Sequence, residues 1–236
     1  MSSPSQYRKG YGRRHGHKGD IEPRLSLQET LTRWPRLAAI VDVMEAASGL
    51  ALAVFLWMHM ALVGSILLGK ASFNAIPRFL DGTHLSVAGI PLLVAVFFVH
   101  ALLAGRKLPG GYREQRILWS HARRLRHRDT WAWFAQAVSG MGLLIFAGIH
   151  LWIILTTWPI EASVSASRVA QLHYLAFYLV LLVLGEVHAG IGLYRLAIKW
   201  GWPPRRPARA VLEVFGIALV GLGLVALYVF RNLGLS

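Results

Sequence analysis

Five stretches of the sequence are apolar over the length needed to cross a lipid bilayer, and this pattern leaves few possible folds. About 20 apolar residues take a helix across the hydrocarbon core. In lipid only helices and closed barrels satisfy the backbone, and continuous apolar runs without strict alternation favour helices. We therefore predict an all-α integral membrane bundle, forming one domain over residues 37–236 behind a basic arm at residues 1–36. The predicted spans are approximately 37–69, 85–105, 131–157, 170–197 and 210–230.

Lysine and arginine are concentrated in alternate connections between these spans. Of the 25 basic residues, eight lie in residues 1–36, eight in 106–128 and five in 195–209, which leaves four elsewhere. Basic residues mark the cytoplasmic loops of membrane proteins. We therefore expect a cytoplasmic N-terminus and a C-terminus on the opposite side. This distribution argues against nucleic-acid binding in spite of the net charge of +14, and leaves open lipid headgroup contact and docking of a soluble partner.

The chain contains no cysteine. This excludes thiolate-held iron–sulfur clusters, disulfides and thioether-attached haem within the chain. Any metal or cofactor must be bound by histidine, carboxylate or backbone groups.

Four histidines lie inside four different spans, where an ionisable ring is costly and is usually functional. With the predicted topology, His59 and His150 fall in the outer halves of their helices, and His100 and His188 fall in the inner halves. Two neutral imidazoles on facing helices can bind one haem iron axially. The pattern predicts two b-type haems at two depths. For any single histidine, a hydrogen-bonded structural role is the alternative.

Two carboxylates occupy informative positions. Glu186 lies two residues before His188 and so points to a different face of its helix. A carboxyl group at this depth must be neutral, paired or close to water, which suggests either a proton relay or a glutamic acid hydrogen-bonded to backbone. Asp81 lies in the first outer connection, at the height of the outer histidine pair, where it is either a proton acceptor or a solvated turn residue.

The segments around the four histidines resemble the di-haem cytochrome b membrane anchors of quinol:fumarate reductases and succinate:menaquinone reductases. The resemblance covers roughly residues 34–231 and is most specific around His188. The matching segments are LWMHMALVGSILL, FFVHALLAGRKLPGGYR, GIHLWIILT and GEVHAGIGLYRLAIKWGW.

The resemblance implies roles for individual residues. It assigns His59 and His150 to an outer haem b, and His100 and His188 to an inner one. Asp81, in RFLDGT, matches the family's quinol-site carboxylate, although the family pattern has the longer glutamate there. Glu186 matches a glutamate that returns protons across the membrane. The basic residues suited to haem propionates are Lys107, Arg168 and Lys199.

The implied function is that of a quinone-reactive, electron-transferring anchor in an oxidoreductase of the bacterial cytoplasmic (inner) membrane. Menaquinol would be oxidised near the outer haem, with Asp81 accepting protons. Electrons would pass through both haems to a cytoplasmic iron–sulfur subunit, and a flavoprotein subunit would reduce fumarate. Reverse flow would make the complex a succinate:menaquinone reductase. A dimer of such heterotrimers is compatible with the sequence, which leaves the oligomeric state open.

Two other functions remain open at this point. The chain could be the cytochrome b anchor of a hydrogenase or formate dehydrogenase, in which a partner on the outer side feeds electrons inward. It could also be a non-redox membrane transporter with structural histidines. The basic inner loops and the segment around His188 disfavour the first, and the paired depths of the histidines disfavour the second.

Overall fold

The computed structural model describes residues 33–201 and 205–236, so most of the basic arm expected at residues 1–36 lies outside the described residues. The prediction of an all-α fold with five transmembrane helices is confirmed, since five helices are long and apolar enough to span a bilayer. They are α2 (Pro35–Gly64, continued by the 3-10 helix η1, Ser65–Leu68), α4 (Leu85–Gly105), α6 (Arg128–Thr156), α8 (Leu172–Lys199) and α9 (Arg205–Leu235).

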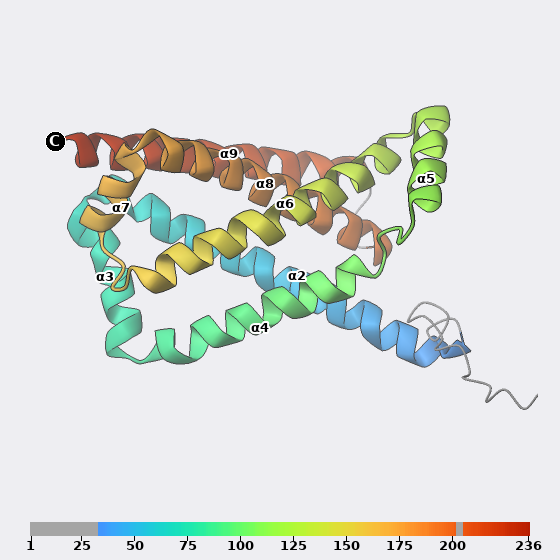
Figure 1. Ribbon diagram of the computed structural model, residues 1–236, viewed down its shortest axis with the longest axis horizontal. Coiled ribbons are helices and arrows are strands. Elements are labelled where there is room, and N and C mark those ends of the chain that lie inside the picture. The colour runs from blue at the N-terminus through green and yellow to red at the C-terminus, as the bar shows by residue number, and fades with distance from the viewer. Residues whose placement is uncertain (1–32, 202–204) are drawn as a thin grey trace, which may run out of the picture.

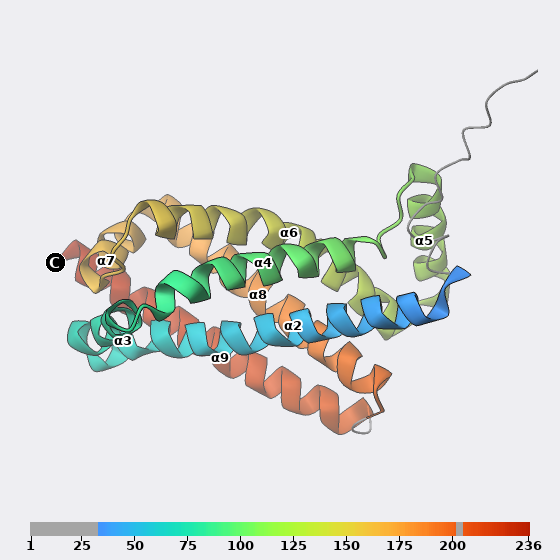
Figure 2. The same ribbon diagram turned by 90° about the horizontal axis from the view of Figure 1, so that it is seen from below.

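Three shorter helices form connections at the two ends of the bundle. Helices α3 (Lys70–Gly82) and α7 (Ala162–Ala170) lie at the end that also holds the C-terminus (Figures 1 and 2). Helix α5 (Tyr112–Leu125) lies at the opposite end, with the start of α2. We call these the outer and the inner end. The basic connection at 106–128 lies at the inner end, and so do the end of α8 and the start of α9, which carry the basic residues on either side of the next inner connection.

The long helices do not all pack on one another. Helices α2, α8 and α9 are in mutual contact and form the centre of the bundle. Helix α4 packs along α2, and α6 packs along α8. Within the described residues, α4 has no comparable contact with α6 or α8, and α6 has none with α2. Helices α4 and α6 are therefore peripheral, each attached to one central helix.

The outer end holds a cluster of buried apolar residues. Ile66 and Phe73 meet Phe230 there, with the Phe73 and Phe230 rings 5.3 Å apart, in a cluster that also includes Ala166 of α7. Gly234 lets α7 and α9 touch, because a side chain at this position would collide with the backbone of Ala166.

Two local features shape the connection from α2 to α7. Gly69 takes φ +104°, a conformation that glycine adopts without steric cost, and the chain turns there from η1 into α3. The Asn74 side chain on α3 accepts a 2.7 Å hydrogen bond from the backbone N–H of Ala162, the first residue of α7. Along the rest of the long helices, large apolar side chains such as Met58 and Leu102 remain exposed, which suits a surface covered by lipid.

Candidate functional site

The four intramembrane histidines meet as two pairs. The rings of His59 on α2 and His150 on α6 have their centroids 5.9 Å apart. The rings of His100 on α4 and His188 on α8 have theirs 6.3 Å apart. Each pair therefore joins one central helix to the peripheral helix with which it does not pack.

The spacing of each pair fits two axial ligands of one metal. Imidazole nitrogens bind first-row metals at about 2 Å, so two rings on opposite sides of an iron have centroids about 6 Å apart. Among the described residues, no cluster of three or more histidine, aspartate and glutamate side chains could hold a bare metal ion. Paired imidazoles without further protein ligands suit haem, because the porphyrin supplies the remaining four nitrogens.

A serine and a glycine on α2 hold the ring of His100. The Ser48 hydroxyl lies 3.2 Å from Nδ1 of His100 and also donates to the carbonyl of Glu45. A Cβ at Gly49 would come within 2.8 Å of Cε1 of His100, so only a glycine leaves room for the imidazole. The ring thus lies against the backbone of α2.

His188 has equivalent surroundings on α6. Its Nδ1 lies 3.0 Å from the carbonyl oxygen of Gln136 and 3.3 Å from the Ser139 hydroxyl. A Cβ at Gly140 would come within 2.8 Å of Cε1 of His188. An Nδ1–H that donates to a backbone carbonyl leaves Nε2 unprotonated and available to a metal.

The sequence carries a signal for this arrangement that the sequence analysis missed. The two histidine-holding segments are EAASG at residues 45–49 and QAVSG at residues 136–140. In each, a backbone carbonyl is followed by serine three residues later and glycine four residues later, which places all three on one face of the helix. The repeat marks the two helix faces that receive the inner histidines.

The outer pair has aromatic neighbours. Phe55 is stacked near the ring of His59, with centroids 5.8 Å apart, and Tyr178 meets His150 edge-on at 5.6 Å. Nδ1 of His150 is buried and has no hydrogen-bond partner among the described residues. Arg168, which is 8% exposed, lies at this end of the bundle and donates a 2.7 Å hydrogen bond to Thr157.

The inner cations Lys107 and Lys199 are engaged in ion pairs. Lys107 Nζ lies 2.7 Å from a carboxylate oxygen of Glu45, and Lys199 Nζ lies 2.9 Å from Asp42. Arg106 contacts both carboxylates. This ion-pair cluster joins α2 to the ends of α4 and α8. A role of the two lysines toward haem propionates stays a prediction, since their charge is already shared with Asp42 and Glu45.

The structure adds one cation that the sequence analysis did not consider. Arg195 lies on α8 seven residues after His188, which places both side chains on the same helix face. Its guanidinium donates a 2.6 Å hydrogen bond to the side-chain carbonyl of Gln136. Gln136 therefore contacts His188 through its backbone and Arg195 through its side chain.

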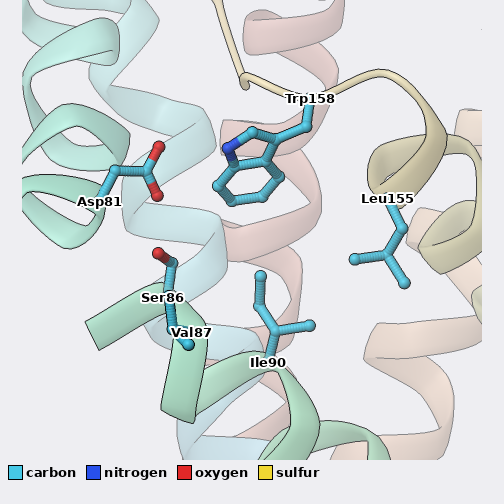
Figure 3. A pocket seen from close by; sticks show the side chains of 6 residues that line it. All are labelled: Asp81, Ser86, Val87, Ile90, Leu155 and Trp158. Carbon is cyan, nitrogen blue, oxygen red and sulfur yellow. The ribbon is translucent and has the colours of Figure 1, made fainter. Parts of the chain in front are cut away.

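A pocket of about 450 Å³ lies at the outer end between α3, α4 and the end of α6 (Figure 3). Asp81 of α3 and the indole of Trp158 face each other across it. Oδ1 of Asp81 is buried and has no hydrogen-bond partner among the described residues. The remaining lining residues are Ser86, Val87, Ile90 and Leu155. Apolar walls with a few polar groups are typical of small-molecule sites of this size.

The pocket lies beyond the outer histidine pair. Leu155 follows His150 by five residues on α6, which corresponds to about 7 Å along the helix axis. Trp158, which lies just beyond the end of α6, also lines the pocket.

Glu186 is buried in the membrane part of α8, with 7% of its surface exposed. Its Oε1 has no hydrogen-bond partner within residues 33–201 and 205–236. The structure therefore does not pair this carboxyl group with a cation in the described part of the chain, and its role as a proton relay stays a prediction.

Comparison with known proteins gives a consistent family. A family model described as "Succinate dehydrogenase/Fumarate reductase transmembrane subunit" matches residues 112–225. The "Fumarate reductase cytochrome b subunit" of Helicobacter pylori is 36% identical over 210 residues, which cover 83% of this chain and 82% of that protein. The protein of the same name from Wolinella succinogenes is 33% identical over 217 residues, 85% of each chain.

Proposed function

Because the chain belongs to the family of fumarate reductase cytochrome b subunits, we propose that it holds two b haems and carries electrons between menaquinol and a fumarate-reducing complex. Membership of the family makes it a multi-pass membrane anchor of an oxidoreductase. The number of haems, the quinol and the electron path are the parts that we propose.

The observation that supports two haems is the spacing of the two histidine pairs, each of which joins a central helix to the peripheral helix with which it does not pack. His59 with His150 and His100 with His188 each have the spacing of two axial imidazoles. When bound, each haem supplies reversible one-electron chemistry. The chain holds the inner rings in place through Gly49 and Gly140 and through acceptors for their Nδ1 atoms.

We assign quinol oxidation to the pocket between Asp81 and Trp158. Oxidation of menaquinol to menaquinone releases two electrons and two protons, so a base must lie beside the hydroxyl groups. The unpaired Oδ1 of Asp81 would be such a base: it would accept one proton, pass it to water outside the pocket and then accept the second. The Trp158 indole N–H is a donor on the opposite wall. Val87, Ile90 and Leu155 supply the apolar surface that a quinone ring requires.

With haem bound at both pairs, electrons would pass from the outer to the inner site and leave at the inner end, where we expect the iron–sulfur and flavoprotein subunits. Because the membrane potential is negative inside, moving one electron inward across the membrane costs about 2.3 kcal/mol of free energy per 100 mV. A proton moving inward through Glu186 would cancel this electrical work. Reverse flow through the same groups would oxidise succinate. A dimer of heterotrimers stays a prediction.

Haem stoichiometry tests the proposal directly. The purified chain should contain two protohaems in a pyridine haemochrome assay, and His59→Ala or His100→Ala should each remove one of them. A colourless chain, or one haem in the unaltered protein, would refute the proposal and favour a transporter with structural histidines. The subunits that co-purify separate a fumarate reductase from a hydrogenase or formate dehydrogenase.

A further inference from the structure

Helix α5 (Tyr112–Leu125) crosses the inner end of the bundle. It connects α4 to α6, and in both views its axis runs across the direction of the five spanning helices (Figures 1 and 2). In a bilayer crossed by the five spanning helices, a helix with this orientation would run along the plane of the membrane.

One sector of α5 packs on the start of α6. The Trp119 ring lies 5.6 Å from the rings of Trp131 and Phe134, and Ala122 is completely buried. These contacts fix the rotation of α5 about its own axis. Two tryptophans therefore meet at the inner end, where membrane proteins concentrate interfacial aromatic side chains.

A second sector exposes apolar side chains, and in its first turn it also carries Glu114, whose carboxylate accepts a hydrogen bond from the backbone N–H of Gly110. Ile117, Leu118 and Leu125 are 46%, 36% and 68% exposed. Leu118 and Leu125 are seven residues apart and lie on one face of the helix, and His121 lies between them and Ile117. No described part of the chain covers these side chains.

The third sector is basic. Arg113, Arg116, Arg123 and Arg124 lie within one side of the helix, about a third of a turn from the apolar sector. All four are exposed. None of them has an ion pair or a side-chain hydrogen bond within the described part of the chain, whereas the nearby Arg106 and Lys107 are paired with carboxylates of α2.

We propose that α5 is an interfacial helix that binds an anionic lipid surface. Its apolar sector enters the boundary between headgroups and acyl chains, and its four arginines bind lipid phosphates. An exposed apolar face beside a basic face is typical of helices that lie in the interface. Anionic lipids of the cytoplasmic leaflet attract arginine near the surface. This site is separate from the histidine pairs and from the quinone pocket, and does not depend on them.

Photo-crosslinking in native membranes distinguishes lipid from protein at this surface. A benzoylphenylalanine replaces Leu118 or Leu125 in the intact complex, and the adducts are identified by mass spectrometry. We expect phospholipid adducts at both positions. Adducts with another protein subunit would overturn the proposal and would make α5 a docking site for that subunit.

The four arginines are tested in the variant that carries benzoylphenylalanine at position 118. In membranes that contain phosphatidylglycerol and phosphatidylethanolamine, Arg→Gln replacement at positions 113, 116, 123 and 124 should abolish the enrichment of phosphatidylglycerol among the adducts. Arg→Lys replacement at the same positions should preserve it. Equal enrichment in the glutamine variant would refute binding of anionic lipid by these residues. The haem content reports independently on the proposed redox function.

Discussion

Gly140 on α6 lies against the imidazole of His188 on α8, so closely that a Cβ at this glycine would come within 2.8 Å of Cε1 of the ring. Gly49 has the same relation to His100, with the same 2.8 Å approach. The inner histidine pair is therefore enclosed by the backbones of the two helices that supply no ligand to it.

Replacing Gly140 with valine should remove the inner haem and retain the outer one. The valine side chain displaces the His188 ring, while an added side chain in a packed region costs only about 1–3 kcal/mol, so the bundle should still fold. The pyridine haemochrome value should fall by half. Gly216→Val on α9 is the control, because a Cβ at Gly216 meets nothing within 4 Å. Two haems in the Gly140 variant would contradict a tight fit at this ring.

Replacing Asp81 with asparagine should slow menaquinol oxidation by about 10²–10⁴-fold, the range expected for loss of a general base. Both haems should remain, and fumarate reduction with a viologen donor, which bypasses the quinone pocket, should be unchanged. Asp81→Glu should retain most of the menaquinol activity because it keeps a carboxylate. Normal menaquinol oxidation in the asparagine variant would remove Asp81 from the mechanism.

Replacing Trp158 with phenylalanine should raise the KM for menaquinol by about fivefold. The variant keeps the apolar wall and loses one N–H donor, and one hydrogen bond contributes about 1 kcal/mol. Trp152→Phe is the matched control, since Trp152 is 70% exposed on α6 and does not line the pocket. Equal KM values in the two variants would argue against a hydrogen bond from Trp158.

Replacing Glu186 with glutamine should make turnover depend on the membrane potential. Without an accompanying proton, each inward electron meets about 2.3 kcal/mol per 100 mV, a slowing of up to about fiftyfold at 100 mV. The variant should contain both haems and should speed up in proteoliposomes when an ionophore collapses the potential. The unaltered complex should show no such response. If the turnover rate of the glutamine variant equals that of the unaltered complex at every membrane potential, the proton relay through Glu186 is excluded.

The fold was predictable because the membrane imposes strong rules on the sequence. The span predicted at 85–105 coincides with α4, and the other spans differ from the observed helices mainly at their ends. The connecting helices α3 and α7 were not predicted. They are short and partly polar, and their packing depends on tertiary contacts such as Asn74 with Ala162 and Gly234 with Ala166.

The proximity of the histidine rings was predictable because one residue type carries the signal. A histidine in an apolar span is conspicuous, and its depth follows from helix direction, so the two pairs could be expected. The EAASG and QAVSG segments were missed because serine and glycine are common in membrane helices for general packing reasons. Trp158 was missed because a tryptophan near a span end has an ordinary explanation as an interfacial residue.

The histidine pairs connect helices that do not otherwise pack on one another, and this affects how the protein is assembled. Helix α4 contributes His100 and α6 contributes His150, and each of these helices rests on one central neighbour. A haem bound between His100 and His188 would connect α4 to α8, and a haem bound between His59 and His150 would connect α6 to α2. Packing of the two peripheral helices would then be coupled to haem insertion, and a chain without haem would hold each of them through one central neighbour only.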